Sequence, residues 1–148
     1  MSELAPEERE QVVAKRRRDD PDASERLARK LAEVVDAKLG EDIVALDVRS
    51  LVGYTDFLVI ATARNERLAK AIHDEVRERL KKEEGLVPAR VEGEQEGRWV
   101  LVDYLDCVLH VFVPEMRDHY PAAGDLRRQL RKARGDVFIG QAMEAVAA

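Results

Sequence analysis

The chain is poor in cysteine and aromatic residues and has no long apolar run. Its 148 residues include one cysteine, Cys107, and one tryptophan, and aromatic side chains make up 5% of the total. A lone cysteine forms no internal disulfide, and no apolar run approaches the roughly 18–20 residues of a membrane-spanning helix. The N-terminus also lacks the apolar core of a signal peptide. We therefore expect a cytoplasmic protein with no membrane association.

Familiar catalytic and cofactor-binding motifs are missing as well. There is no phosphate-binding loop, no glycine triplet of a dinucleotide fold, no His-Glu-x-x-His pair and no Cys-x-x-Cys pair. The three histidines and Cys107 have none of the usual zinc-ligand spacings. None of the serines at positions 2, 24 and 50 lies in a nucleophile elbow. We expect no cofactor, no bound metal and no enzyme activity.

Composition divides the chain into three parts. Residues 1–22 are a charged extension that we expect to be mobile, because a helix there would have few apolar anchors. Residues 23–120 form one domain, and residues 121–148 form a basic tail that we expect to be partly helical. The central part holds twenty acidic and fifteen basic residues, so it suits a basic partner better than nucleic acid. The basic cluster at 15–18 is interpreted as a solvated charge run, with RNA contact as the alternative.

Hydrophobic periodicity predicts an α/β fold with a mixed sheet of about five strands. Two helices are expected at residues 24–39 and 65–85, the second capped by Asn65 and ended by Gly85. Two nearly continuous apolar strands, at 42–48 and 57–61, should be covered on both faces. A short strand at 86–91 precedes a hairpin within residues 97–113. This order of helices and strands favours a layered mixed sheet.

The hairpin is the most informative part of the sequence. With its bend at Tyr104 and Leu105, strand alternation sorts the side chains onto two faces. One face is wholly apolar and is expected to line the core: Val100, Val102, Cys107, Leu109 and Val111. The other mixes apolar, aromatic and ionisable residues: Trp99, Leu101, Asp103, Asp106, Val108, His110 and Phe112. A core would not hold the polar groups of this second face without partners, so we predict that it meets another molecule.

Two functions are compatible with the mixed face. Asp103 and Asp106 should lie side by side, and Asp47 ends an adjacent strand, so these carboxylates could hold magnesium for nucleotidyl transfer. The favoured reading is a binding surface, in which Trp99 is the apolar anchor and the two acids pair with cations of a partner. His110 is expected to pack beside Trp99 and to bond to the backbone.

Five separate blocks resemble the ribosomal silencing factors, also called the RsfS or Iojap family. The blocks lie within residues 24–120, at 42–48, 55–62, 85–88, 92–93 and 99–112. The resemblance implies a fold like that of nucleotidyltransferases without their activity. It also implies binding to the large ribosomal subunit through ribosomal protein L-fourteen. Occupying that surface keeps the small subunit from docking, so translation is repressed when nutrients are scarce.

The resemblance also indicates which residues bind the partner. The family's contact surface includes the positions of Trp99, Asp103, Tyr104 and Asp106. Together with the mixed hairpin face, this predicts a partner-binding set of Trp99, Leu101, Asp103, Tyr104, Leu105, Asp106, His110, Glu92 and Glu94. The family commonly has glycine where this chain has Leu105. The charge of the tail helix at 126–134 makes it a candidate for contact with ribosomal RNA. The exposed apolar face is compatible with a homodimer of the free protein, and the sequence does not fix its oligomeric state.

Overall fold

The computed structural model describes residues 4–50, 52–119 and 137–139. The helices in this part of the chain are α1 (Pro6–Asp19), α2 (Ala23–Ala37), α3 (Glu66–Glu84) and α4 (Pro114–His119). The strands are β1 (Glu41–Asp47), β2 (Phe57–Thr62), β3 (Arg90–Glu92), β4 (Trp99–Asp103), β5 (Cys107–Phe112) and β6 (Val137–Ile139). The tail helix expected at 126–134 lies outside the described residues. None of the described helices has the length and apolarity needed to cross a membrane.

The strands form one mixed sheet in the order β3-β4-β5-β2-β1-β6. Strands β2 and β5 run parallel, and every other neighbouring pair is antiparallel. The predicted α/β class and its five strands are confirmed. The additional strand β6 pairs with β1 and was not predicted.

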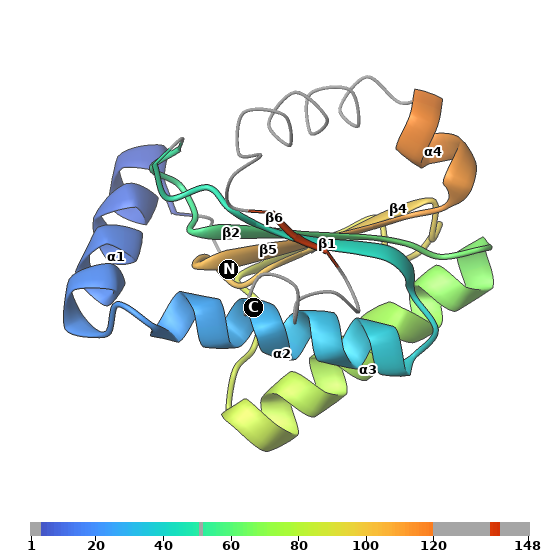
Figure 1. Ribbon diagram of the computed structural model, residues 1–148, viewed down its shortest axis with the longest axis horizontal. Coiled ribbons are helices and arrows are strands. Elements are labelled where there is room, and N and C mark those ends of the chain that lie inside the picture. Colours follow the sequence, from blue (N-terminus) through green and yellow to red (C-terminus); the bar gives the residue numbers. More distant parts are fainter. Residues whose placement is uncertain (1–3, 51, 120–136, 140–148) are drawn as a thin grey trace.

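Helices cover the two faces of the sheet unequally. Figure 1 shows α2 and α3 along one face, α4 on the opposite side and α1 at one end of the sheet. The wholly apolar hairpin face packs in the cluster that includes residues of α2 and α3, as expected. Within it Cys107 is fully buried, and its thiol donates to the carbonyl oxygen of Ser24 at 3.2 Å. We call the other side of the sheet the open face.

The open face carries a second apolar cluster. Its buried members come from β1, β2, β5 and the loop after β1: Leu46, Val48, Leu58, Ile60, Val108 and Phe112. Trp99, Leu101 and Met116 are half-buried against this cluster. Strands β1 and β2 therefore bury apolar side chains on both faces, as their continuous apolar sequences predicted.

Helix α3 has the ends that the sequence predicted. The Asn65 side chain accepts a hydrogen bond from the backbone N–H of Leu68 at 2.8 Å, which caps the first turn. Gly85 ends the helix with φ of 68°, a left-handed conformation that glycine adopts without strain.

The register of the β4–β5 hairpin differs from the predicted one by two residues. Trp99 pairs with Phe112 and Asp103 with Val108, so residues 104–106 form the turn. We had expected Asp103 to lie directly opposite Asp106, but in this register it does not. Because side chains alternate with a period of two, this shift leaves every strand residue on its predicted face.

The N-terminal segment also differs from expectation. Residues 6–19 form helix α1 and pack at the end of the sheet, whereas we had expected a mobile extension there. Only Val13 of this helix is buried, which is why apolar periodicity gave no signal. Its polar attachments are made mainly by arginines, through ion pairs and hydrogen bonds, and they lie at the candidate functional site.

The turn between β3 and β4 positions Trp99 through Gly93. Gly93 has φ of 76°, and a Cβ there would lie 1.9 Å from the carbonyl oxygen of Trp99. Gly85 has a similar φ of 68°, but a Cβ there would meet nothing within 4 Å. The two glycines thus share a backbone conformation and differ in steric surroundings.

We expect Gly93→Ala to lower the free energy of unfolding by at least ~1 kcal/mol more than Gly85→Ala. Both substitutions place a side chain on a left-handed backbone, at roughly 1–2 kcal/mol, and only the first also collides with backbone. Urea unfolding of the two variants, followed by circular dichroism, measures the difference. Equal losses would show that the β3–β4 turn is not sterically fixed.

Candidate partner-binding site at the hairpin end

Three carboxylates gather at one end of the sheet. Asp103 ends β4, Asp106 lies in the turn before β5, and Asp56 directly precedes β2. Since β2 and β5 are parallel neighbours that begin together at Phe57 and Cys107, the residues before them meet at the same edge. The backbone N–H groups of Asp56 and Phe57 both donate to the carbonyl oxygen of Asp106, at 2.9 and 3.1 Å. We call Asp56, Asp103, Leu105 and Asp106 the hairpin-end surface.

The turn keeps a backbone conformation that usually belongs to glycine. Leu105 has φ of 71°, the left-handed region. Its N–H donates to a carboxylate oxygen of Asp103 at 2.8 Å, and its carbonyl accepts from the Thr55 hydroxyl at 2.7 Å. These bonds hold a non-glycine residue in this conformation. The side chain of Leu105 is half-buried.

Helix α1 supplies an arginine to each carboxylate of this surface. Arg9 makes a bidentate pair with Asp103, with nitrogen–oxygen distances of 2.5 and 2.9 Å. Arg17 forks onto Asp56, with its Nε at 3.0 Å, and Arg16 lies 3.5 Å from Asp106. The side chains of Asp103 and Asp56 are only 2% and 3% exposed, so both need these cations.

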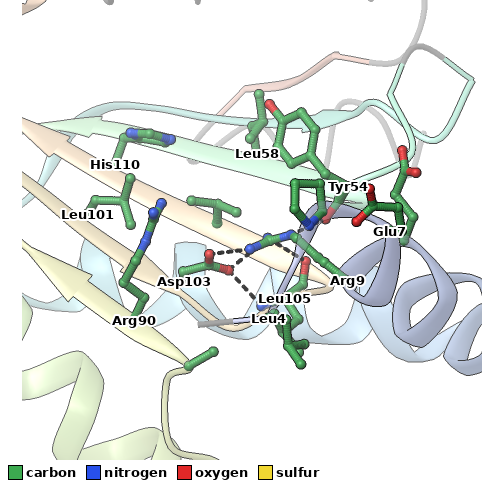
Figure 2. Close-up of a pocket in the computed structure, with 14 residues that line it drawn as sticks. Leu4, Glu7, Arg9, Tyr54, Leu58, Arg90, Leu101, Asp103, Leu105 and His110 are labelled. Atoms are coloured by element: carbon green, nitrogen blue, oxygen red, sulfur yellow. Dashed lines mark hydrogen bonds and ion pairs between the residues drawn. The ribbon is translucent and has the colours of Figure 1, made fainter. Parts of the chain in front are cut away.

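Arg9 is held on all sides. Besides the Asp103 pair, its Nε donates to the carbonyl oxygen of Tyr54 at 2.6 Å and its guanidinium lies 5.7 Å from the centre of the Tyr54 ring. Figure 2 shows this side chain reaching from α1 to Asp103 and Leu105. Arg9 therefore joins three segments: α1, the loop before β2, and the hairpin turn.

Asp106 is the least satisfied of the three acids. Burial raises its pKa, Arg16 opposes this rise, and the neighbouring Asp56 carboxylate adds to it. Its arginine pair is also the longest of the three. A closer cation would therefore stabilise the ionised form of Asp106 further.

A pocket lies beside these carboxylates on the open face. It measures about 920 Å³, and its apolar lining includes Leu58, Leu101 and Val108. Arg90 and His110 border it along the strands, and residues of α1 close it at the other end (Figure 2). The site thus combines an apolar depression with acidic groups at its edge.

The aromatic residues of the open face form one stack. The Trp99 ring lies 5.0 Å from the ring of Phe112, centre to centre, and the indole N–H donates to Nδ1 of His110 at 3.0 Å. His110 therefore packs beside Trp99 as predicted, but it bonds to the indole and not to the backbone. Because an indole N–H only donates, Nδ1 must be unprotonated. Burial lowers the pKa of His110 to about 4, which keeps the ring neutral.

The predicted partner-binding residues fall into three groups. Trp99, Leu101, Asp103 and His110 share the open face, and Glu92 lies opposite Leu101 on the edge strand β3. Leu105 and Asp106 are half-buried in the turn, and Glu94 is half-buried in the loop that follows β3.

Tyr104 forms the third group. It packs in the core cluster shared with α2 and α3, away from the open face. Burial raises its pKa to about 12, and its hydroxyl has no hydrogen-bond partner among the described residues. Alternation along β4 explains this position, because Tyr104 continues the row of Val100 and Val102.

The site contains residues that the prediction omitted. Asp56 lies in the family-like block at 55–62, and its place directly before a buried strand was the available signal. Arg90 lies opposite Asp103 in the register of β3 and β4, so it brings a positive charge to the open face. Arg9 gave no signal beyond a charged segment.

The structure does not bring Asp47, Asp103 and Asp106 together as the magnesium site that the nucleotidyltransferase hypothesis requires. Asp47 pairs with Arg49, while Asp103 and Asp106 pair with arginines of α1. Burial acts to raise the pKa of Asp47, but the Arg49 hydrogen bonds outweigh it and the pKa is lowered. Within the described ranges, no group of three or more His, Cys, Asp or Glu side chains is arranged to hold a metal ion.

Known proteins resemble this chain over most of its described length. The profile of a family described as "Ribosomal silencing factor during starvation" matches residues 21–122. A ribosomal silencing factor RsfS from Chromobacterium violaceum is 40% identical over 81 residues, which are 55% of this chain and 66%, just under two thirds, of that protein. The RsfS of Halalkalibacterium halodurans is 33% identical over 98 residues, 66% of this chain and 83% of that protein.

A solved structure has the same fold. The crystal structure of a Chromobacterium violaceum protein superposes on this chain with a TM-score of 0.61 and 37% sequence identity. The superposition covers 66% of this chain and 81% of the other.

We expect Arg9→Ala to lower the free energy of unfolding by about 1–2 kcal/mol, because it leaves the buried Asp103 carboxylate without its cation. Arg16→Ala is the matched control. It should cost only a few tenths of a kcal/mol (~0.3), since the Arg16 side chain is half exposed and its pair is long. Chemical unfolding at neutral pH measures both. Equal losses would contradict a special role for the Arg9–Asp103 pair.

Stability should fall as pH drops through the titration range of His110. Above its ordinary pKa of 6.5, the imidazole is neutral in both the folded and the unfolded protein, so its titration does not change stability. Between pH 6.5 and about 4, only the unfolded form takes up the proton, so stability decreases by at most ~1.4 kcal/mol per pH unit.

His110→Phe isolates this effect from the titration of carboxylates. The variant lacks the imidazole, so the stability of the wild type relative to it should decline from pH 6.5 towards pH 4. Urea unfolding at a series of pH values gives the comparison. Parallel curves for the two proteins would refute a neutral, buried His110.

Proposed function

Because this chain belongs to the ribosomal silencing factor family, we propose that it represses translation by binding the large ribosomal subunit through ribosomal protein L-fourteen. The bound protein would stand in the path of the small subunit and prevent the two from joining. Family membership supports the repression of translation. The hairpin-end surface and the adjoining open face support the binding step, because they offer a built site for a basic partner.

The acids of the hairpin-end surface favour a cationic partner. Asp56, Asp103 and Asp106 already bind three guanidinium groups within the chain, which shows the chemistry that this surface accepts. Charged pairs of this kind orient a partner and speed its association more than they add affinity. A basic patch on a ribosomal protein has the complementary charge.

The open face supplies apolar area for affinity. Leu101 lines the pocket, Trp99 is half-buried beside it, and Leu105 projects at the turn. Completing the burial of such side chains contributes up to roughly 1.5–3 kcal/mol for each large residue. The stack of Trp99 on Phe112 keeps this surface rigid, so little ordering is needed on binding.

Repression by this route needs no chemical step. The domain acts by excluding the small subunit from an occupied surface, and its effect depends on affinity and concentration alone. Such a mechanism fits the family's description as silencing factors during starvation. Trp99, Leu101, Leu105, Asp103 and Asp106 are the residues that we propose to make the contact, with Glu92 and Glu94 at the rim.

Charge reversal at the rim should weaken binding to isolated large subunits. We expect the double variant Glu92→Lys/Glu94→Lys to bind at least ~tenfold more weakly in a sedimentation assay, because it turns an attractive edge into a repulsive one. The matched control is Glu78→Lys/Glu84→Lys, which makes the same change in net charge on exposed residues of α3.

The control should keep most of the wild-type affinity. If both double variants lose affinity equally, binding follows net charge and the proposed surface is wrong. Wild-type affinity of the rim variant would also count against the surface. Failure of the wild-type protein to bind large subunits at all would refute the proposed function itself.

A further inference from the structure

Helix α1 presents its arginines to the hairpin-end surface as a single stripe. Arg9, Val13, Arg16 and Arg17 stand at intervals of four, three and one residues, which places them on one side of an α-helix. The three arginines pair with the three carboxylates. Val13, which lies between Arg9 and Arg16 in the sequence, is buried. A cationic helix face thus already occupies the surface that the proposed function assigns to a basic partner.

We propose that α1 is an intramolecular occupant of the hairpin-end surface and must leave before the ribosomal partner binds there. The inference rests on the proposed function, since it concerns the same surface. It makes the N-terminal segment an autoinhibitory element that competes with a basic partner for Asp56, Asp103 and Asp106.

The two occupants exclude each other because Asp103 has no accessible oxygen left. Both of its carboxylate oxygens accept from Arg9, one also accepts from the Leu105 N–H, and its side chain is 2% exposed. A partner arginine or lysine therefore reaches Asp103 only if Arg9 withdraws. The pocket is closed on the same side by α1 residues, so withdrawal also widens access to Leu101 (Figure 2).

Helix α1 is attached in a way that permits release. Val13 is its only buried residue, and it belongs to neither apolar cluster of the described sheet. The Arg16 and Arg17 side chains are 49% and 35% exposed, so water and salt screen their pairs. A helix of 14 residues is marginally stable alone, so detachment and partial melting accompany each other.

The charges of the surface favour exchange over permanent closure. Asp106 is held by the longest pair, and burial keeps its pKa raised despite Arg16. A partner that brings a closer cation to Asp106 would compensate this carboxylate better than α1 does. Replacement of α1 by such a partner keeps every carboxylate of the surface paired.

A reversible disulfide tests the proposal directly. An ideal Cβ at Gly53 lies 3.6 Å from Cγ of Glu10, and the three heavy atoms nearest to it all belong to the Glu10 side chain. The full-length variant Glu10→Cys/Gly53→Cys can therefore tie α1 to the loop before β2. The single native cysteine, Cys107, is fully buried and does not interfere.

The same protein is compared oxidised and reduced for binding to isolated large subunits. We expect the oxidised form to bind at least ~tenfold more weakly, since α1 is then held on the surface. Equal affinity, or tighter binding when oxidised, would overturn the proposal, the latter because α1 would be part of the contact. Absence of binding in both states, when the wild type also fails to bind, would refute the proposed function and this inference with it.

Charge variants in the full chain test the opposite direction. Arg9→Gln/Arg16→Gln/Arg17→Gln should bind large subunits several-fold more tightly than the wild type, because the competing stripe is gone. The control Lys15→Gln/Arg18→Gln removes two basic residues from the exposed side of α1 and should leave affinity unchanged. Weaker binding by the triple variant, with circular dichroism showing a folded protein, would overturn the proposal.

Discussion

A carboxylate removed from water must be compensated by cations or hydrogen-bond donors, and Asp103 meets this constraint at the end of β4. Its oxygens accept from Arg9 of α1 and from the backbone of Leu105. One buried charge therefore fixes the left-handed turn of the hairpin and the position of a helix that is distant in sequence. The arrangement of the candidate site follows from satisfying this one group.

The sheet provides the rigid base on which this constraint acts. Its central strands bury apolar side chains on both faces, and α2 and α3 cover one face completely enough to leave Cys107 inaccessible. The open face keeps a pocket next to the carboxylates. The proposed binding groups are thus carried by strand ends and a short turn, where position is defined more precisely than on a long loop.

Much of this fold could be predicted from the sequence, because apolar periodicity reports burial directly. It located strands β1 to β5, helices α2 and α3, and the two faces of the hairpin. It could not fix the hairpin register, because a shift of two residues leaves the faces unchanged. Tyr104 was predicted at the bend and among the partner-binding residues, whereas the structure extends the core row of Val102 to it.

Helix α1 and Asp56 show where sequence reasoning reaches its limit. The helix is attached by arginines at a helical spacing, and such a pattern looks the same as a solvated charged face until its partners are known. Asp56 and Asp106 come together only through the parallel pairing of β2 with β5. Pairing between distant segments therefore determines the acidic character of the site.

Hydrogen exchange of the full chain, free and bound to isolated large subunits, tests the central claim most directly. If the hairpin-end surface contacts the subunit and displaces α1, the amides of residues 104–106 become protected while those of residues 6–19 exchange faster. Unchanged exchange at 104–106, or added protection along 6–19, would contradict the account.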